Sequence, residues 1–261
     1  MKLLIKFPTR VRARKFLNVL SKYVRLLEDK STPIIVSCDT DDYSMKEEFV
    51  TEVIGQYKNV TVQFNNNNTK IEAINHNMDT FDFDIVLLAS DDMVPRIKGF
   101  DRIIKEKMMA HYPDTDGVLW FNDGYKGDKL NTLCILGKKY FDRFGYIYNP
   151  EYKSVWCDNE FMDVSKLLDK VTYFDDVIIR HEHPDWGFGS NDSIHMTNVK
   201  NESSDRLTYE RRKQQNFGFS PPISLKSRIA VSILSFKSLL NYHAFWKFPS
   251  MDMDTLVSIN L

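Results

Sequence analysis

The sequence predicts an α/β protein in which a mixed, mainly parallel β-sheet is flanked by helices. Short apolar runs alternate with amphipathic segments from the first residue to about Asn122. Strands that alternate with helices at this spacing need crossover connections, and crossover connections make neighbouring strands parallel. The alternation breaks down after Asp123, so we expect the second half of the chain to add strands of mixed direction and further helices.

Five apolar runs in the first half are predicted to be strands. They are short, lack a helical period and end in polar or turn-forming residues. The five runs are residues 2–7, 33–38, 59–64, 84–89 and 117–121.

Helices are predicted between these strands. Residues 11–29 carry apolar side chains at steps of three and four, which mark one face of a helix. A capping-box pattern of Ser44 and Glu47 predicts the start of a second helix. A third is expected from about Thr69 and a fourth over residues 100–112. The side chains expected to face the core are Ala13, Leu17, Leu20, Val24 and Leu27 in the first helix and Phe49 and Val53 in the second.

The second half contains a further strand, two helices and a final strand. Residues 131–137 are predicted to form a strand, and residues 138–145 a short helix that ends at Gly145. Residues 157–170 have the pattern of an amphipathic helix, and residues 171–183 that of one long strand.

No linker rich in proline, glycine or serine divides the chain. We therefore expect one domain over residues 1–204 and a helical C-terminal extension over residues 205–261 that packs on the same domain. The run from Asn65 to Asn68 predicts a loop beside the ligand site, because asparagine tolerates left-handed backbone conformations.

Composition narrows the class of protein. A chain of 261 residues with 43% apolar and 27% charged residues is expected to be soluble and globular. The net charge of -1 argues against nucleic acid as a partner, because phosphates attract an excess of lysine and arginine. Three widely spaced cysteines favour a reducing compartment, and the N-terminus has too few apolar residues for a secretion signal. No run reaches the ~18 apolar residues of a membrane span. We expect a cytoplasmic protein in which residues 227–240 allow peripheral membrane contact.

Polar side chains recur where the predicted strands end. The carboxyl ends of parallel strands meet at one edge of the sheet, where the ligands of open α/β sheets bind. Each polar group alone is also explained by ordinary turn chemistry, but the set together predicts a site at this edge. Its members are Pro8, Thr9 and Arg10 after the first strand, Asp39 and Asp41 after the second, Ser90, Asp91 and Asp92 after the fourth, and residues 122–125 after the fifth.

Two pairs of residues in the sequence suggest a metal. Neighbouring strand residues point to opposite faces, so Asp91 and Asp92 reach one ligand only if the backbone has left the strand, which Pro95 favours. Carboxylate oxygens suit Mg²⁺ or Mn²⁺ bound to a diphosphate. His181 and His183 project to the same side of an extended segment, and imidazole nitrogen favours Mn²⁺ over Mg²⁺. A structural role for the two histidines is the alternative.

Asp158 and Glu160 lie at the predicted start of a helix. The helix macrodipole alone explains carboxylates at this position. The functional alternative is a general base that takes a proton from an attacking hydroxyl.

These motifs together resemble those of GT-A nucleotide-sugar glycosyltransferases, particularly small single-domain members related to family 2. The motifs are "SDD" at residues 90–92, "DNE" at residues 158–160 and "HEHP" at residues 181–184, in the family's order. The resemblance covers residues 2–190 and implies a GT-A (Rossmann-like) fold. The family's D-x-D motif would begin here at Ser90, with Asp92 in its last position.

The resemblance also implies roles for single residues. Asp92 and either His181 or His183 would hold Mn²⁺, or Mg²⁺, and Asp158 would be the catalytic base. The nucleoside-diphosphate sugar would be held by Pro8, Thr9, Arg10, Asp39, Asp41, Lys70, Ser90 and Asp91, with Asp39 at the base and Lys70 near the diphosphate or ribose.

The implied reaction is the metal-dependent transfer of a hexosyl or pentosyl group to a hydroxyl of a glycan or other acceptor. UDP is the favoured nucleotide. A base on the face opposite the leaving group inverts the anomeric carbon, and retention stays open.

Two other functions compete with this one. A sugar nucleotidyltransferase commonly has a glycine-rich basic loop after its first strand, and residues 7–15 are basic but lack glycine. A non-catalytic carbohydrate-binding module would use aromatic side chains as a stacking surface and would bind without metal. Its candidates are Tyr146, Tyr148, Trp156 and Trp186.

Overall fold

The computed structural model describes residues 1–182 and 193–219, with residues 193–199 described in their backbone alone. A seven-stranded sheet has the order β3-β2-β1-β4-β7-β6-β8. Strands β1, β2, β3 and β4 run parallel to one another, β7 is antiparallel to both β4 and β6, and β8 is parallel to β6. The predicted mixed, mainly parallel sheet is therefore confirmed. Its strands are β1 (Leu3–Pro8), β2 (Ile34–Asp39), β3 (Val60–Asn65), β4 (Ile85–Leu88), β6 (Val118–Phe121), β7 (Ile135–Gly137) and β8 (Val171–Phe174).

A second, two-stranded sheet pairs β5 (Met93–Pro95) with β9 (Ile179–His181) in antiparallel register, with Met93 opposite His181. The prediction of one strand over residues 171–183 is wrong, because the chain changes sheets after β8. Asp175 lies at the change, where its carboxylate accepts hydrogen bonds from the Asn122 amide and the Tyr173 hydroxyl, both at 3.0 Å. β8 is only four residues long and β9 only three, so the sequence pattern does not show that they pair with different strands.

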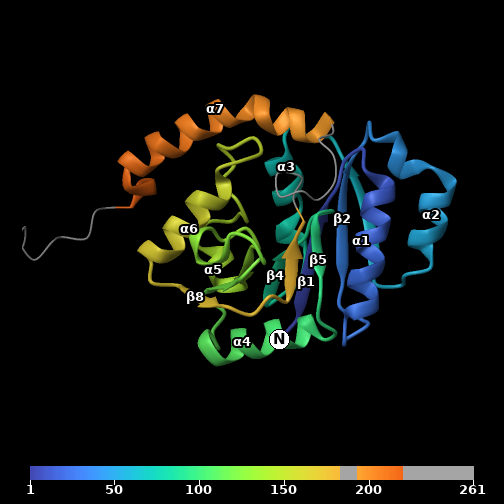
Figure 1. Cartoon of the computed structure of the whole chain (residues 1–261), viewed down its shortest axis with the longest axis horizontal. Helices are drawn as coiled ribbons and strands as arrows, with labels where there is room; N and C mark the ends of the chain where they lie inside the picture. Colours follow the sequence, from blue (N-terminus) through green and yellow to red (C-terminus); the bar gives the residue numbers. More distant parts are fainter. Residues whose placement is uncertain (183–192, 220–261) are drawn as a thin grey trace, which may run out of the picture. The chain divides into compact units, whose positions relative to one another are not determined.

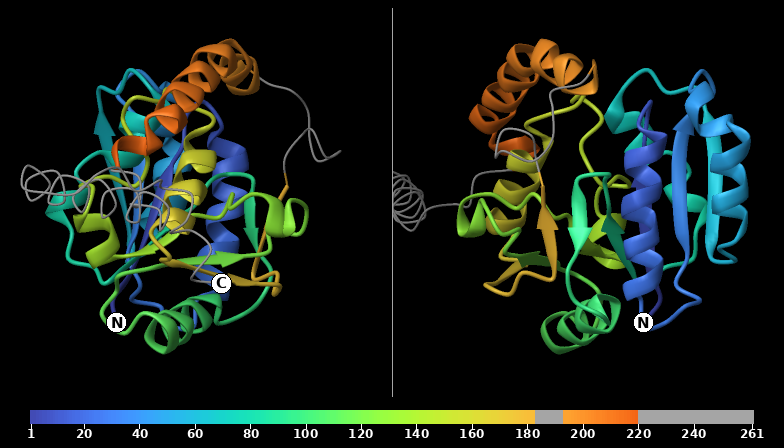
Figure 2. Two further views of the ribbon diagram at one scale, coloured as in Figure 1. Left: turned by 90° about the vertical axis from the view of Figure 1, so that its left-hand side faces the viewer. Right: turned by 45° about the vertical axis from the view of Figure 1, so that its right-hand side comes forward.

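Helices cover both faces of the large sheet (Figures 1 and 2). One hydrophobic cluster joins α1 (Ala13–Leu26), α2 (Glu48–Gly55) and α4 (Phe100–His111) to one face. A second cluster joins α3, α5, α6 and α7 to the other face. Their bounds are α3 (Lys70–Asn75), α5 (Lys138–Asp142), α6 (Cys157–Leu167) and α7 (Ser193–Gln214). Short 3-10 helices lie at η1 (Tyr43–Lys46), η2 (Met78–Thr80), η3 (Gly127–Lys129) and η5 (Asn216–Gly218).

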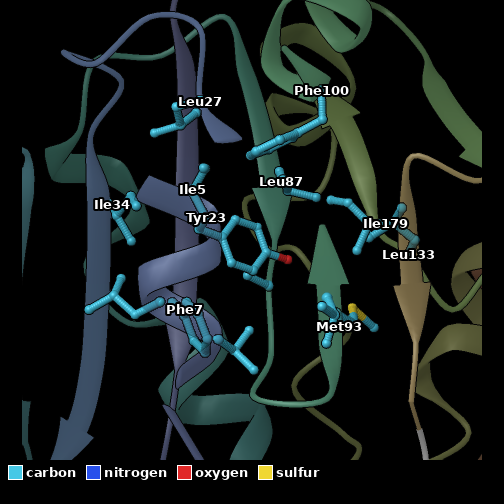
Figure 3. Packing of buried hydrophobic residues seen from close by; sticks show 14 of the residues in the cluster. Ile5, Phe7, Tyr23, Leu27, Ile34, Leu87, Met93, Phe100, Leu133 and Ile179 are labelled. Carbon is cyan, nitrogen blue, oxygen red and sulfur yellow. The ribbon is translucent and has the colours of Figure 1, made fainter. Parts of the chain in front are cut away.

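Strand β1 shows how alternation builds the two clusters. Ile5 and Phe7 pack on the α1 side, whereas Leu4 packs on the α3 side. The Phe7 ring lies 5.6 Å from Tyr23 of α1, and Tyr23 lies 5.6 Å from Phe100 of α4, both edge to face (Figure 3). This aromatic chain ties two helices to the strand that carries the first predicted site residues.

The buried face of α1 agrees in part with the one predicted, because Ala13, Leu20 and Leu27 are buried as expected. Leu17 and Val24 are only half-buried, and larger aromatic side chains take the inward positions. Buried residues are Ala13, Phe16, Val19, Leu20 and Tyr23, with Leu27 just beyond the helix. Steps of three and four residues fit the predicted face and the observed face equally well. The large rings of Phe16 and Tyr23 explain why the observed face is the buried one.

The predicted capping box of Ser44 and Glu47 is wrong. Ser44 lies inside η1, where Asp42 is the N-cap and accepts the Ser44 N–H at 3.1 Å. Helix α2 begins only at Glu48, without a side-chain cap. Its fully buried residues are Val50 and Ile54, whereas the predicted Phe49 and Val53 are half-buried.

Two other helix boundaries agree with the prediction. Thr69 is the N-cap of α3, and its hydroxyl accepts the Glu72 N–H at 3.1 Å. Gly145 follows α5 with a left-handed φ of 74°, and its N–H donates to Phe141 O at 2.8 Å.

Residues Met1–Phe217 form one compact unit. Helix α7 is continuous through Asp205, so the boundary predicted between residues 204 and 205 falls inside a helix. Residues 220–261 lie outside the described residues, and the packing of this extension stays a prediction. Across the described ranges, no helix is long and apolar enough to cross a membrane.

Candidate functional site

The ends of β1 and β2 carry a network centred on Arg10. Its guanidinium donates to Asp41 through two bonds of 2.9 and 2.8 Å and also forms an ion pair with Asp39. These two carboxylates raise the pKa of Arg10 above its usual value. The buried Asp39 additionally accepts the Asn67 amide at 2.7 Å, whereas Asp41 is exposed. The loop predicted for the asparagine run therefore lies beside this network, although none of residues 65–68 has a positive φ.

Pro8 and Thr9 lead into this network. Pro8 ends β1 opposite Ser37 of β2, and the Thr9 N–H donates to Ser37 O at 3.0 Å. The Thr9 hydroxyl is buried and has no partner among the described residues. Buried hydroxyls normally have a hydrogen-bond partner, so this oxygen has an acceptor and a donor position to offer a ligand.

The two aspartates after β4 have different surroundings. Asp91 is buried against α1, where Arg12 lies at 3.0 Å and Lys15 at 3.4 Å. Burial raises the pKa of Asp91, although these two cations oppose the shift. Asp92 instead accepts the Ser90 hydroxyl and faces His181. Within the "SDD" segment, Asp91 therefore contacts the start of α1, and Asp92 contacts β9.

His181 lies between two carboxylates. Its Nε2 is 3.7 Å from Asp92 Oδ1, and its Nδ1 is 3.8 Å from Asp123 Oδ2. Burial opposes protonation of His181, but both carboxylates favour it and raise its pKa to about 9. Burial also opposes ionisation of the carboxyls, yet His181 holds the pKa of Asp123 at about 2 and that of Asp92 well below its usual range. The group as a whole is strongly charged at neutral pH.

Asp123 lies within residues 122–125, which are predicted at this edge of the sheet, but the sequence predicts no ligand or catalytic role for it. One oxygen accepts the N–H groups of Tyr125 (2.9 Å), Lys126 (2.6 Å) and Gly127 (3.2 Å), and the other accepts the Thr132 hydroxyl at 2.8 Å. In sequence it belongs to an "NDG" turn after the fifth strand, which is an ordinary turn pattern. No local signal indicates that the same carboxylate faces β9.

Asp158 and Lys70 come from the first turns of α6 and α3. Burial raises the pKa of Asp158, and the charge of Lys70 and the Asn159 N–H at 3.0 Å oppose this shift. Lys70 also lowers the pKa of Asp92 by its charge. His181 acts on Asp158 in the same way. The four predicted residues therefore share one electrostatic neighbourhood.

Glu160 is the second carboxylate of the "DNE" motif, and its hydrogen bonds are to other side chains of the protein. It is buried and accepts hydrogen bonds from Asn149 (2.9 Å), Tyr152 (2.8 Å) and Arg212 (2.7 and 2.8 Å). These donors occupy both oxygens of the carboxylate, so Glu160 has no free oxygen to offer a substrate. Asp158 remains as the candidate base of the motif.

The donor atoms present fit a divalent cation in part. Asp92 supplies carboxylate oxygen and His181 imidazole nitrogen, a combination that suits Mn²⁺. Within residues 1–182 and 193–219, no group of three or more His, Cys, Asp or Glu side chains is arranged to hold a metal. His183, the other predicted ligand, lies outside the described residues.

The aromatic residues considered as a sugar-stacking surface are engaged in packing. Tyr148 is buried edge to face with Phe161 at 5.8 Å, and Trp156 lies 5.2 Å from Tyr209 of α7. Tyr146 stacks on Phe144 at 5.6 Å. Trp186 lies outside the described residues.

No protein-family model and no curated protein matches this sequence. Solved structures do resemble the fold. The mannosyltransferase PcManGT from Pyrobaculum calidifontis, in complex with GDP-Man and Mn²⁺, has a TM-score of 0.57 at 10% identity and covers 92% of this chain and 80% of its own. S. aureus TarS with UDP-GlcNAc has a TM-score of 0.58 at 15% identity over 76% of this chain and 61% of the TarS chain.

A third structure is glucosyl-3-phosphoglycerate synthase from Mycobacterium tuberculosis with Mn²⁺, UDP and phosphoglyceric acid. Its TM-score is 0.51 at 11% identity, over 71% of this chain and 73% of its own. At these identities the likeness concerns the fold. It confirms the predicted GT-A fold, with its mixed, mainly parallel sheet between helices.

Proposed function

We propose that this chain is a metal-dependent glycosyltransferase that moves a sugar from a nucleoside-diphosphate sugar to an acceptor hydroxyl. The observation that carries the proposal is the gathering of Asp92, His181, Asp158 and Lys70 from four separate segments of the chain into one charged neighbourhood. The GT-A fold supports it. The similar structures contain GDP-Man, UDP-GlcNAc or UDP, and two of them contain Mn²⁺.

The nucleoside part of the donor is assigned to the ends of β1 and β2. Asp39 is buried and ionised carboxylates accept N–H donors strongly, so it suits the N–H edge of a base such as uracil. Arg10 and Asn67 orient this carboxylate. The hydroxyl of Thr9 and the ring of Pro8 lie at the same strand ends. We propose UDP as the favoured nucleotide.

Asp92 and His181 would hold Mn²⁺, or Mg²⁺, with His183 as the third predicted ligand. Such an ion neutralises negative charge on the departing nucleoside diphosphate. Ser90 orients Asp92 through its hydroxyl, and Lys70 supplies a further positive charge near the predicted diphosphate position. Asp91 forms an ion pair with Arg12, which holds residues 90–92 against the start of α1.

Asp158 takes the proton of the acceptor hydroxyl as that oxygen attacks the anomeric carbon. Its buried surroundings raise the pKa of the carboxyl, which makes the carboxylate a better proton acceptor than an exposed aspartate. We propose attack from the face opposite the leaving group and hence inversion. Nuclear magnetic resonance of the product's anomeric configuration tests this point.

We further propose a cytoplasmic location and a glycan or other hydroxyl-bearing acceptor, with peripheral membrane contact through residues 227–240. The three cysteines Cys38, Cys134 and Cys157 are buried free thiols, as expected in a reducing compartment.

Thermal unfolding with a panel of nucleoside diphosphates, with and without Mn²⁺, tests the proposal. A ligand at a hundred times its dissociation constant stabilises the fold by about 2.7 kcal/mol, which is enough to distinguish one nucleotide from the others. We expect a shift with UDP or GDP that requires Mn²⁺ and is lost in Asp92→Asn.

The matched control is Asp101→Asn. Asp101 is a buried carboxylate of α4 that accepts the N–H groups of Glu28 (2.9 Å) and Asp29 (3.0 Å), and it belongs to no predicted site. This variant is expected to unfold at a lower temperature and to keep the nucleotide shift. A nucleotide-induced shift in unfolding temperature that does not need Mn²⁺ and persists in Asp92→Asn would contradict the proposed donor site.

A further inference from the structure

One buried carboxylate of helix α7, that of Asp205, binds the segment that leads into α6 through hydrogen bonds. Asp205 has only 1% of its surface exposed. It accepts the N–H groups of Lys153 (3.0 Å), Ser154 (2.9 Å) and Val155 (3.0 Å). Three consecutive backbone donors on one carboxylate fix the path of this segment relative to α7, because bonds to a charged acceptor are stronger than neutral ones.

The next residue, Trp156, begins α6 in a strained conformation. It is the N-cap of α6 with a left-handed φ of 62°. Such a conformation is unfavourable for a non-glycine residue and persists only where the surroundings hold it. The Trp156 ring packs 5.2 Å from Tyr209, one helical turn along α7 from Asp205. Contacts from α7 therefore determine where α6 begins, and Asp158 is the second residue of α6.

Helices α6 and α7, whose backbones are drawn in Figure 1, pack on each other. A second set of side-chain contacts joins their bodies. Arg212 pairs with buried Glu160 through two bonds of 2.7 and 2.8 Å. Tyr209 donates its hydroxyl to Asp163 at 2.7 Å. Residues 205, 209 and 212 are three or four apart and thus share one face of α7. This face is directed at α6 and at the segment before it.

We propose that Asp205 is a positioning residue for Asp158, an inference that rests on the proposed function of Asp158 as general base. Asp205 holds residues 153–155, these set the left-handed turn at Trp156, and that turn directs the first turn of α6 toward Lys70. A displacement of about 1 Å caused far from the chemistry can cost about 10²-fold in rate. Nucleotide binding at Arg10 and Asp39 lies on other elements and is not affected.

The test compares Asp205→Asn with Asp163→Asn in the full chain. Asparagine keeps the shape of Asp205 but places an NH₂ group against backbone N–H donors. Asp163→Asn weakens a different contact between α6 and α7, with Tyr209 and Lys213, and leaves residues 153–155 held. The activity measured is release of nucleoside diphosphate from a panel of UDP- and GDP-sugars, with water as the acceptor. The binding measured is the thermal shift with UDP and Mn²⁺.

We expect Asp205→Asn to lower kcat by about 10²-fold while KM and the nucleotide shift stay as in the wild type. Asp163→Asn is expected to keep the wild-type kcat. Equal losses in both variants, or a rise of KM in Asp205→Asn, would overturn the inference, because either result indicates a general loosening of the two helices.

Should Asp205→Asn fail to fold by circular dichroism, Trp156→Gly replaces it. Glycine accepts the left-handed φ without strain but loses the contact to Tyr209, so the same fall in kcat at constant KM is expected. Wild-type kcat in Trp156→Gly would overturn the inference. A wild-type chain that releases no nucleotide and shows no nucleotide shift would overturn the proposed function and the inference with it. Wild-type kcat in a folded Asp205→Asn variant would overturn the inference alone.

Discussion

The imidazole Nε2 of His181 lies 3.7 Å from a carboxylate oxygen of Asp92, although the two residues are far apart in sequence. The short antiparallel sheet of β5 and β9 causes this proximity, since His181 pairs with Met93, the residue after Asp92. The backbone supports it further, because the Glu182 N–H donates to Asp92 O at 2.6 Å. A two-stranded sheet thus joins the strand-end acidic motif to the histidine motif.

The charge of His181 is expected to make stability depend on pH in the metal-free protein. The folded-state pKa of His181 is about 9, above its ordinary value of 6.5. Its contribution to the free energy of unfolding is therefore fully present below pH 6.5 and is lost as the pH rises through 9. The pKa shift corresponds to about 3 kcal/mol. Urea unfolding from pH 6 to 9.5 with a chelator present measures this loss.

His181→Gln should remove that pH dependence, whereas His111→Gln, at the exposed end of α4, should retain it. The opposite trend is expected in acid. The pKa values of Asp92 and Asp123 are lowered, so their contribution is lost as the pH falls below about 4. A wild-type stability that is constant from pH 6 to 9.5 would contradict the proposed pairing.

Asp158 should set the acid side of the pH–rate profile. Burial raises the pKa of its carboxyl, so activity is expected to fall, as the pH is lowered, at a midpoint above the ordinary aspartate value of about 4. Asp158→Asn should lower kcat by about 10²- to 10⁴-fold and retain the nucleotide shift. Steady-state release of nucleoside diphosphate across pH measures both effects. An unchanged kcat in Asp158→Asn would exclude it as the base.

Asp39 and Asp41 provide a matched pair at the nucleoside end of the site. Both bind Arg10, but Asp39 is buried and Asp41 is exposed. A buried hydrogen bond to a charged group contributes about 1.5–3 kcal/mol, whereas water screens an exposed ion pair and leaves it weak. Asp39→Asn should weaken UDP binding in isothermal calorimetry by about tenfold or more, and Asp41→Asn should change it little. Equal effects of the two variants would show that the pairing with Arg10, rather than Asp39 itself, determines binding.

Gly137 is expected to tolerate no side chain. A Cβ added there would lie 2.1 Å from Thr115 O, at the junction of β7 and α5. Gly137→Ala should therefore destabilise the fold by about 1–3 kcal/mol or more through forced backbone movement. At Gly55, the last residue of α2, a Cβ would meet nothing within 4 Å. Gly55→Ala should stabilise the fold by about 0.4–1 kcal/mol, and urea unfolding of both variants measures the contrast.

Local patterns predicted most of the elements correctly. Strands β1 to β4, β6 and β7 agree with the predicted runs, because a buried strand shows its apolar character in a few consecutive residues. The N-cap at Thr69 and the end of α5 before Gly145 follow from side-chain and backbone chemistry within one turn. The wrong predictions concern features that residues nearby in sequence do not determine. Examples are which side chains of α1 face the core and where α2 begins.

The sequence by itself determined the α/β class, the helix and strand order of the first half, and the set of polar residues at the strand ends. Each of these depends on residues within a few positions of one another. Only the tertiary structure decided that His181 lies between Asp92 and Asp123, and that Asp205 of α7 holds the segment before Asp158. These contacts depend on which strands pair and which helix faces meet. Such choices come from the packing of the whole unit, and no local sequence pattern contains them.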